Sequence, residues 1–516
     1  MINRILTVGG ITLLSRVTGF LRDIMLAAVL GAGPVADAFF VALRLPNHFR
    51  AIFAEGAFNA AFIPAYARVR GSSGSEAVRL FSDRIFTLLL ASQVVLLGIA
   101  LLFTPLVIDL LAPGFSKDPG RFALAVDLTR ITFPYLLLVS LVTLYGGILN
   151  ALDRFAAAAA APILLNLSMM MTLALAAFFP TAGHAAAWGV LLAGFLEFLL
   201  VGAGAARAGV LPRFAWPRID QEVMVFLKRF WPATIGSAGT QIALFADTII
   251  ASFLATGALS ALYYADRLNQ LPIGVIGIAA GTVLLPEMAR RITAGDEAGA
   301  RHSQNRAIEL TLLLSVPCLV AFLIVPDQIM RGLFGRGAFT AADAHNAALT
   351  LMAYAIGLLP FVLLRSVTAT FLSRGDTSTP VKALFVAVAV NVALKVLLMD
   401  RYAQVGLAFA TSVGAWINLA LLVWFSARQN FLVIDQKLRR SSAKFVIAGA
   451  ALAAALLLCE RPVAAAFSSW TSLRSEMTLL VLAAIGAIIY GIAIGALFRR
   501  EWRGLISGHP GPKPFA

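Results

Sequence analysis

The sequence predicts an all-α polytopic membrane protein with fourteen transmembrane helices. Three observations predict this class: a large apolar fraction, few charges, and long uninterrupted apolar segments. Of the 516 residues, 60% are hydrophobic and 13% are charged, and the mean hydropathy is +0.87. Ordinary soluble domains carry about 25% charged residues. The two cysteines lie far apart and give no disulfide framework.

Fourteen apolar segments are long enough to span a bilayer, because a helix needs about 20 such residues to cross. They lie near residues 5–30, 35–64, 85–112, 124–149, 157–179, 185–206, 231–256, 259–287, 307–334, 346–372, 380–399, 403–427, 443–459 and 477–498. The second segment is too long for a straight span, so we expect it to tilt or bend. Prolines inside later segments, among them Pro134, Pro272 and Pro360, predict broken helices. No cleavage site follows the first segment, so we expect it to be retained.

The loops between these segments differ in charge. Lys and Arg are much more frequent in one alternate set of loops than in the other, which predicts that both termini are cytoplasmic. The same distribution argues against nucleic-acid binding despite the net charge of +15, because most of the charge lies in short loops between apolar spans.

The first twelve segments contain an internal repeat. FIPAYAR at 62–68 aligns with LLPEMAR at 284–290, and FPYLLLVS at 133–140 aligns with LPFVLLRS at 359–366. Six spans per half is an even number, so the halves enter the membrane in the same sense. We therefore expect two six-helix lobes in a parallel pseudo-repeat plus two C-terminal helices. The predicted domains are 1–215, 216–430 and 431–516.

Positively charged residues interrupt several of the apolar segments. A charge at mid-bilayer costs on the order of 2.5–3.5 kcal/mol, so these side chains should face protein, water or a bound anion. They are Arg16, Arg22, Arg44, Arg50, Arg130, Arg267, Arg365 and Lys395. A hydrophobic protein with such an interior is suited to hold an anion, and arginine suits phosphate because its planar fork donates two parallel hydrogen bonds.

Helical geometry places several charged residues together. In the second segment Asp37, Arg44 and Glu55 fall within roughly 20° of one another, and in the first Arg16 and Asp23 share a face. The candidate substrate-binding residues are Arg16, Arg22, Asp23, Asp37, Arg44, Arg50, Glu55 and Arg267.

Structural roles for the same charges remain open. Arg16 or Arg22 could pair with Asp23, and Arg44 with Asp37, which would only lock helices together. The cations outside the candidate set, Arg130, Arg365 and Lys395, could extend from span ends to the interface.

No nucleotide-binding loop, catalytic triad or metal motif occurs. We therefore expect a transporter and not an enzyme, with no cofactor.

Three stretches resemble the MurJ (MviN) family, a branch of the multidrug/oligosaccharidyl-lipid/polysaccharide exporter superfamily. They are SRVTGFLRD at 15–23, GAGPVADAFFVALRLPNHFRAIFAEGAFNAAFIP at 31–64 and YYADRLNQLPIGVIGIAAGTVLLP at 263–286. The resemblance covers essentially the whole chain. It implies a flippase that moves lipid II, the undecaprenyl-diphosphate-linked peptidoglycan precursor, from the cytoplasmic to the periplasmic leaflet of the bacterial inner membrane.

The resemblance also implies a site. Two lobes would surround a cationic cavity, the last two spans would form a groove for the lipid tail, and Arg16, Arg22, Asp37, Arg50 and Arg267 match family residues important for flipping. The chain departs from some relatives at Ala51 and Gln270, which puts fine contacts and ion coupling in doubt.

Partners and rival functions follow from this. The expected partners are lipid II, membrane lipids and peptidoglycan synthesis proteins, and the expected driving force is the membrane potential or an ion gradient. A flippase for another lipid-linked oligosaccharide would share the cationic cavity, whereas a drug/cation antiporter should have an acidic interior. A scaffold for cell-wall synthesis is the third alternative.

Overall fold

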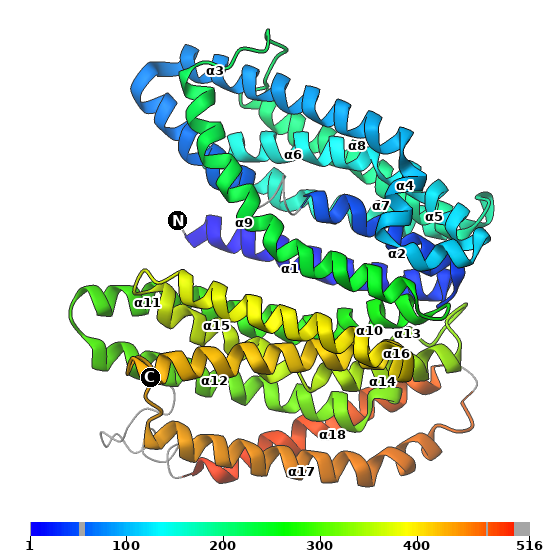
Figure 1. The fold of residues 1–516 in the computed structure, drawn as a ribbon. Helices are drawn as coiled ribbons and strands as arrows, with labels where there is room; N and C mark the ends of the chain where they lie inside the picture. Colours follow the sequence, from blue (N-terminus) through cyan, green and yellow to red (C-terminus); the bar gives the residue numbers. More distant parts are fainter. Residues whose placement is uncertain (1, 51–56, 471–472, 500–516) are drawn as a thin grey trace. The chain divides into compact units, whose positions relative to one another are not determined.

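The computed structural model describes residues 2–50, 57–470 and 473–499, and within these ranges it contains helices and no strand (Figure 1). The chain separates into two compact units. The first unit comprises residues 1–260 and 337–339, and the second comprises residues 261–336 and 340–516.

The first unit is built from long helices joined by short connections. Its elements are α1 (Ile2–Leu30), α2 (Pro34–Phe49), α3 (Ala57–Leu102), α4 (Thr104–Leu111), the 3-10 helix η2 (Pro113–Lys117), α5 (Pro119–Thr132), α6 (Pro134–Ala151), α7 (Ala156–Ala174), the 3-10 helix η3 (Ala176–Phe178), α8 (Ala182–Arg207) and α9 (Gln221–Ser252). Helix α7 packs against α1 and α8, while α3 packs against α6 and α9.

The second unit has the same character. Its elements are α10 (Ala258–Pro272), which begins in the first unit, the π-helical turn η4 (Ile273–Gly277), α11 (Ile278–Thr293), α12 (Glu297–Ile324), α13 (Pro326–Phe334), α14 (Ala341–Ala355), α15 (Leu358–Leu372), α16 (Ser378–Arg428), α17 (Gln436–Ala466) and α18 (Arg474–Leu497). Helix α17 packs against both α12 and α18.

Local sequence explains many helix boundaries. The side chains of Asp220 and Asp435 accept backbone N–H hydrogen bonds at the N-termini of α9 and α17, and Thr340 forms a capping box with Asp343 at α14. Pro134 begins α6, and Pro272 ends α10 at the π-helical turn. Proline cannot continue the ladder of backbone hydrogen bonds, and the helix assignment changes at these two prolines, whereas Pro360 lies inside α15.

Helix α3 is a helical hairpin and not one straight rod. Its backbone leaves the helical region at Gly74, where φ is +82°, a conformation that favours glycine. In a continuous helix Phe62 and Phe81 would lie about 28 Å apart at 1.5 Å per residue. Their ring centroids are instead 5.9 Å apart and stacked. The two halves of α3 therefore fold back on each other around an aromatic core.

Helix α16 reverses in the same way, at Ala403, where φ is +43°. A Cβ on Gly414 would lie 3.0 Å from that of Asn391, although the two residues are far apart in sequence. This break separates the predicted segments 380–399 and 403–427.

Each predicted segment coincides with helical structure over its described residues. Nine helical stretches of the described chain are long and apolar enough to span a membrane, and one of them, Ser378–Arg428, contains two predicted segments. The all-α, multi-pass class is confirmed, whereas the count of fourteen stays a prediction. The lobe boundaries at 215 and 430 also stay predictions; contacts alone group α9 with the first unit.

Candidate functional site

The first candidate residues lie on α1, where Arg22 is buried in a polar cluster. Its Nη2 lies 2.7 Å from Asp23 Oδ1, and its Nη1 donates to Asn166 Oδ1 on α7 at 3.0 Å. The Asn166 amide in turn donates to Ser15 O at 3.0 Å and to Thr18 Oγ1 at 3.1 Å. The internal Arg22–Asp23 pair that the sequence left open is therefore present within α1, and the hydrogen bonds of Asn166 hold α1 against α7.

Arg16 behaves differently, although it lies less than two turns before Arg22. Its side chain is exposed and forms no hydrogen bond or ion pair with another described residue. Its guanidinium is therefore accessible on the surface of the first unit.

Asp37, at the start of α2, is fully buried and surrounded by donors. Its carboxylate accepts hydrogen bonds from Gly257 N at 2.8 Å, Ser260 N at 3.0 Å and Ser260 Oγ at 2.7 Å. Arg121 Nη1 lies 3.5 Å from Asp37 Oδ2. This arrangement ties α2 to the connection between α9 and α10.

Arg44 does not pair with Asp37, contrary to the alternative left open by the sequence. The two residues share a helix face, but seven residues separate them by about 10 Å along the axis. Arg44 Nη1 instead donates to Thr248 Oγ1 on α9 at 2.7 Å. Arg44 forms no ion pair with any carboxylate that the structure describes, so its charge is held by a neutral hydroxyl.

Two further candidates, Arg50 and Glu55, come from the second predicted segment. Arg50 is half-buried and lines a cavity of about 340 Å³ in the first unit, together with Asn59 and Glu197. Glu55 lies outside the described residues, as does Ala51.

Arg267 lies on α10, in the second unit, and is half-buried. Its Nε donates to Tyr263 Oη at 3.3 Å, and its guanidinium carbon lies 5.3 Å from the centroid of the same ring. One tyrosine thus positions the cation through both a hydrogen bond and a cation–π contact.

The three cations outside the candidate set differ in how exposed their side chains are. Arg130 and Arg365 are exposed, which fits side chains that reach an interface. Lys395 is only 2% exposed, so the prediction that it extends to an interface is wrong. Its position along the segment did not reveal that neighbouring helices enclose it.

Two other arginines are buried although they lie outside the predicted apolar segments. Arg121, which partners Asp37, lies on α5 with its guanidinium carbon 4.1 Å from the Phe115 centroid. Arg306, on α12, contacts Glu309 and Asp435. Both lie beside apolar segments, and only the fold reveals their acidic partners.

Comparison with known proteins decides the family. A family model described as "Lipid II flippase MurJ" matches residues 26–494. The chain belongs to this family. The MurJ family is one of flippases, so the predictions of family and of a transporter that is not an enzyme are confirmed.

Individual relatives agree with the MurJ assignment. A protein of Rhizobium tropici named "Probable lipid II flippase MurJ" is 38% identical over 513 residues, which is 97% of this chain and 96% of the relative. A protein of Burkholderia cenocepacia named "Lipid II flippase MurJ" is 33% identical over 81% of this chain and 82% of its own length.

Solved structures agree on the fold. A structure titled "Lipid II flippase MurJ, inward closed conformation" has a TM-score of 0.79 at 23% identity, covering 96% of this chain and 99% of that one. An inward-facing multidrug resistance MATE transporter of the MOP superfamily has a TM-score of 0.66 at 15% identity, covering 81% and 94%. The chain therefore has the fold of these solved structures.

Proposed function

We propose that this protein flips lipid II from the cytoplasmic to the periplasmic leaflet of the bacterial inner membrane. The observation that carries the proposal is the MurJ family match, which extends over residues 26–494. The name of that family supplies the substrate. Both termini would be cytoplasmic, in accordance with the charge of the loops.

Arginines would hold the diphosphate. Arg44 is the best supported, because its charge is positioned by Thr248 and no described carboxylate neutralises it. Arg267, which Tyr263 orients, is the other arginine expected to bind the diphosphate. Arg16 and Arg50 would add positive potential, while Arg22, Asp23 and Asp37 hold their helices in place.

The second unit contains an apolar groove suited to the polyprenyl tail. A cavity of about 630 Å³ lies among α12, α17 and α18. Leu313, Leu456 and Leu482 are among its lining residues. Tyr490 also lines it, and its hydroxyl donates to Leu313 O at 2.8 Å, which satisfies the polar atom. An isoprenoid chain would meet almost no unpaired polar group there.

Alternating access would move the head group. The two lobes would open first to the cytoplasm and then to the periplasm, with the tail remaining in lipid. A membrane potential that is negative inside favours outward movement of an anion by about 2.3 kcal/mol per charge per 100 mV. The membrane potential would therefore favour export of the head group, and an ion gradient is the other energy source to test.

Substitution of Arg44 tests this proposal. In a leaflet-specific assay of lipid II, Arg44→Gln should lower flipping at least about tenfold, and Arg44→Lys should recover part of it because charge remains but the planar fork is lost. The matched control is Arg130→Gln, which removes an exposed cation of α5. Normal flipping by Arg44→Gln would refute capture by this residue. In cells depleted of the protein, a lipid-linked oligosaccharide other than lipid II accumulating at the inner leaflet would favour the alternative substrate.

A further inference from the structure

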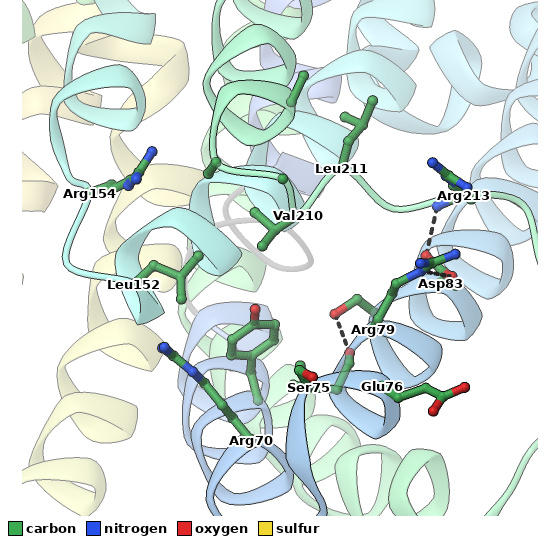
Figure 2. Close-up of a pocket in the computed structure, with 16 residues that line it drawn as sticks. Arg70, Ser75, Glu76, Arg79, Asp83, Leu152, Arg154, Val210, Leu211 and Arg213 are labelled. Atoms are coloured by element: carbon green, nitrogen blue, oxygen red, sulfur yellow. Dashed lines mark hydrogen bonds and ion pairs between the residues drawn. The ribbon is translucent and has the colours of Figure 1, made fainter.

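The first unit contains a second, larger cavity that the proposed transport path does not use. Its volume is about 1060 Å³ (Figure 2). Three segments line it: the two halves of α3 around Gly74, the turn after α6, and the chain that follows α8. These segments belong to the loop set predicted to face the cytoplasm.

Arginines dominate the polar lining of this cavity. Figure 2 shows Arg70, Arg79, Arg154 and Arg213 contributed by all three segments. Only Arg79 approaches a carboxylate, with its Nε 4.0 Å from Asp83 Oδ2. The side chains of the other three make no ion pair or hydrogen bond with residues that the structure describes. The cavity therefore offers guanidinium groups that are available to an anion.

The break at Gly74 creates this arrangement. Arg70 and Arg79 are nine residues apart, so a continuous helix would place them about 180° apart, on opposite faces. Because α3 reverses at Gly74, both side chains line one cavity.

Hydrogen bonds hold the opposite wall in place. Asp83 Oδ1 accepts from Arg213 N at 2.7 Å, and Thr87 Oγ1 accepts from Ala215 N at 3.0 Å. These bonds attach the chain after α8 to α3 and occupy the Asp83 carboxylate. Glu76 is exposed, and its carboxylate, which also lines the cavity, can accept hydrogen bonds from hydroxyl groups of a ligand.

The same wall continues into exposed aromatic residues. Phe214 is 71% exposed and Trp216 is 77% exposed, and both follow directly after Arg213. Aromatic side chains are enriched where a membrane meets water, and basic pockets on the cytoplasmic side of membrane proteins bind lipid head groups. The neighbourhood is therefore that of a bilayer interface.

We propose that this cavity binds the phosphate head group of an anionic membrane lipid that also carries hydroxyl groups. Arg70 and Arg154 donate to the phosphate oxygens from one side, Arg79 and Arg213 supply further positive charge, and Glu76 accepts from the head-group hydroxyls. Phe214 and Trp216 lie at the level where the acyl chains begin. None of the residues that line this cavity is among the candidates for substrate binding, so the site does not depend on the transported substrate.

Binding to the full chain in uncharged detergent micelles tests the proposal. The probe is dioctanoylphosphatidylglycerol, measured by isothermal titration calorimetry beside inorganic phosphate and dioctanoylglycerol. The double variant Arg70→Gln/Arg154→Gln should weaken lipid binding at least about tenfold, because charge-assisted hydrogen bonds to phosphate are lost. The matched control is Arg218→Gln/Arg229→Gln, which removes two exposed arginines of the same unit that do not line the cavity.

Each possible result either supports or overturns the proposed lipid site. Retained binding by the control and weakened binding by the cavity variant supports the site. Equal weakening of both variants would show a general surface potential, and no weakening, or no binding by the native chain, would remove the site. If inorganic phosphate binds as tightly as the lipid, the ligand is a soluble phosphate compound and the lipid assignment is wrong. Tight binding of dioctanoylglycerol would show adsorption through acyl chains alone.

Discussion

Removal of the Asp37 carboxylate should destabilise the protein before it affects any substrate contact. The carboxylate is fully buried, accepts three hydrogen bonds from Gly257 and Ser260, and lies 3.5 Å from the Arg121 guanidinium. Arg121 is itself only 6% exposed. Breaking a buried ion pair from one side costs about 3–5 kcal/mol, because the remaining charge stays buried without its partner.

The predicted loss for Asp37→Ala is therefore about 3–5 kcal/mol in the free energy of unfolding. Ser260→Ala removes one hydroxyl donor and leaves the ion pair, so it should cost about 1 kcal/mol. Asp37→Asn keeps a hydrogen-bond acceptor but leaves the charge of Arg121 uncompensated. Its loss of unfolding free energy should therefore lie between those of Asp37→Ala and Ser260→Ala. Equilibrium unfolding of the purified chain in mixed micelles measures all three.

A double-mutant cycle isolates the ion pair. If Asp37 and Arg121 stabilise the fold together, the combined Asp37→Asn/Arg121→Gln variant should lose much less than the sum of the two single losses. The anchoring role would be refuted if the Asp37→Asn variant unfolds like the native protein but no longer flips lipid II. That result would return Asp37 to the substrate site, where the sequence placed it.

Three further predictions concern other polar clusters. Asn166→Ala should cost about 1–3 kcal/mol in unfolding free energy, because Arg22 loses a buried hydrogen-bond acceptor. The flipping activity per folded molecule should stay unchanged. Arg306→Gln should cost about 3–5 kcal/mol, because the fully buried Glu309 loses its cation. Hydrogen bonds from Thr379 lower the pKa of Asp376 from its ordinary value of 3.8, so its stabilisation is complete above that pH and is lost as the pH falls through the lowered pKa. The difference in melting temperature between the native chain and Asp376→Asn should therefore shrink below about pH 4.

Controls for these predictions come from comparable positions. Asn391→Ala removes a half-buried asparagine whose side-chain oxygen accepts no hydrogen bond from a described residue, and Arg439→Gln removes an exposed arginine instead of the buried Arg306. Equal losses in variant and control would contradict the first two predictions. A melting-temperature difference that stays constant from pH 7 to pH 3 would contradict the third.

Apolar length predicted the helical segments, because it is a property of short stretches of sequence, whereas the orientation indicated by the loop charges stays a prediction. The residues of 15–64 and 263–286 indicated the family, and the repeat indicated two similar lobes. The reversals in α3 and α16 also follow from the sequence in outline, since each separates two predicted segments. The breaking residues, Gly74 and Ala403, were not predicted, because a single backbone angle leaves little trace in hydropathy.

Side-chain partners were much less predictable. Helical angles correctly placed Asp37 and Arg44 on one face, but an angle does not show what packs opposite that face. The partners came from residues more than 200 positions away: Ser260 for Asp37 and Thr248 for Arg44. Only Arg22 and Asp23, which are neighbours in sequence, formed a pair that the sequence had named.

The kind of partner separates structural arginines from those suited to bind an anion. Arg22 is neutralised by Asp23, so an incoming phosphate would have to compete with a carboxylate 2.7 Å away. Arg44 is held by the Thr248 hydroxyl, which orients the guanidinium without cancelling its charge. A transporter needs the second kind, since a substrate must be bound and then released. Replacing Thr248 by valine should therefore weaken substrate capture through the orientation of Arg44, whereas an acidic residue at 248 should abolish it by neutralising the charge.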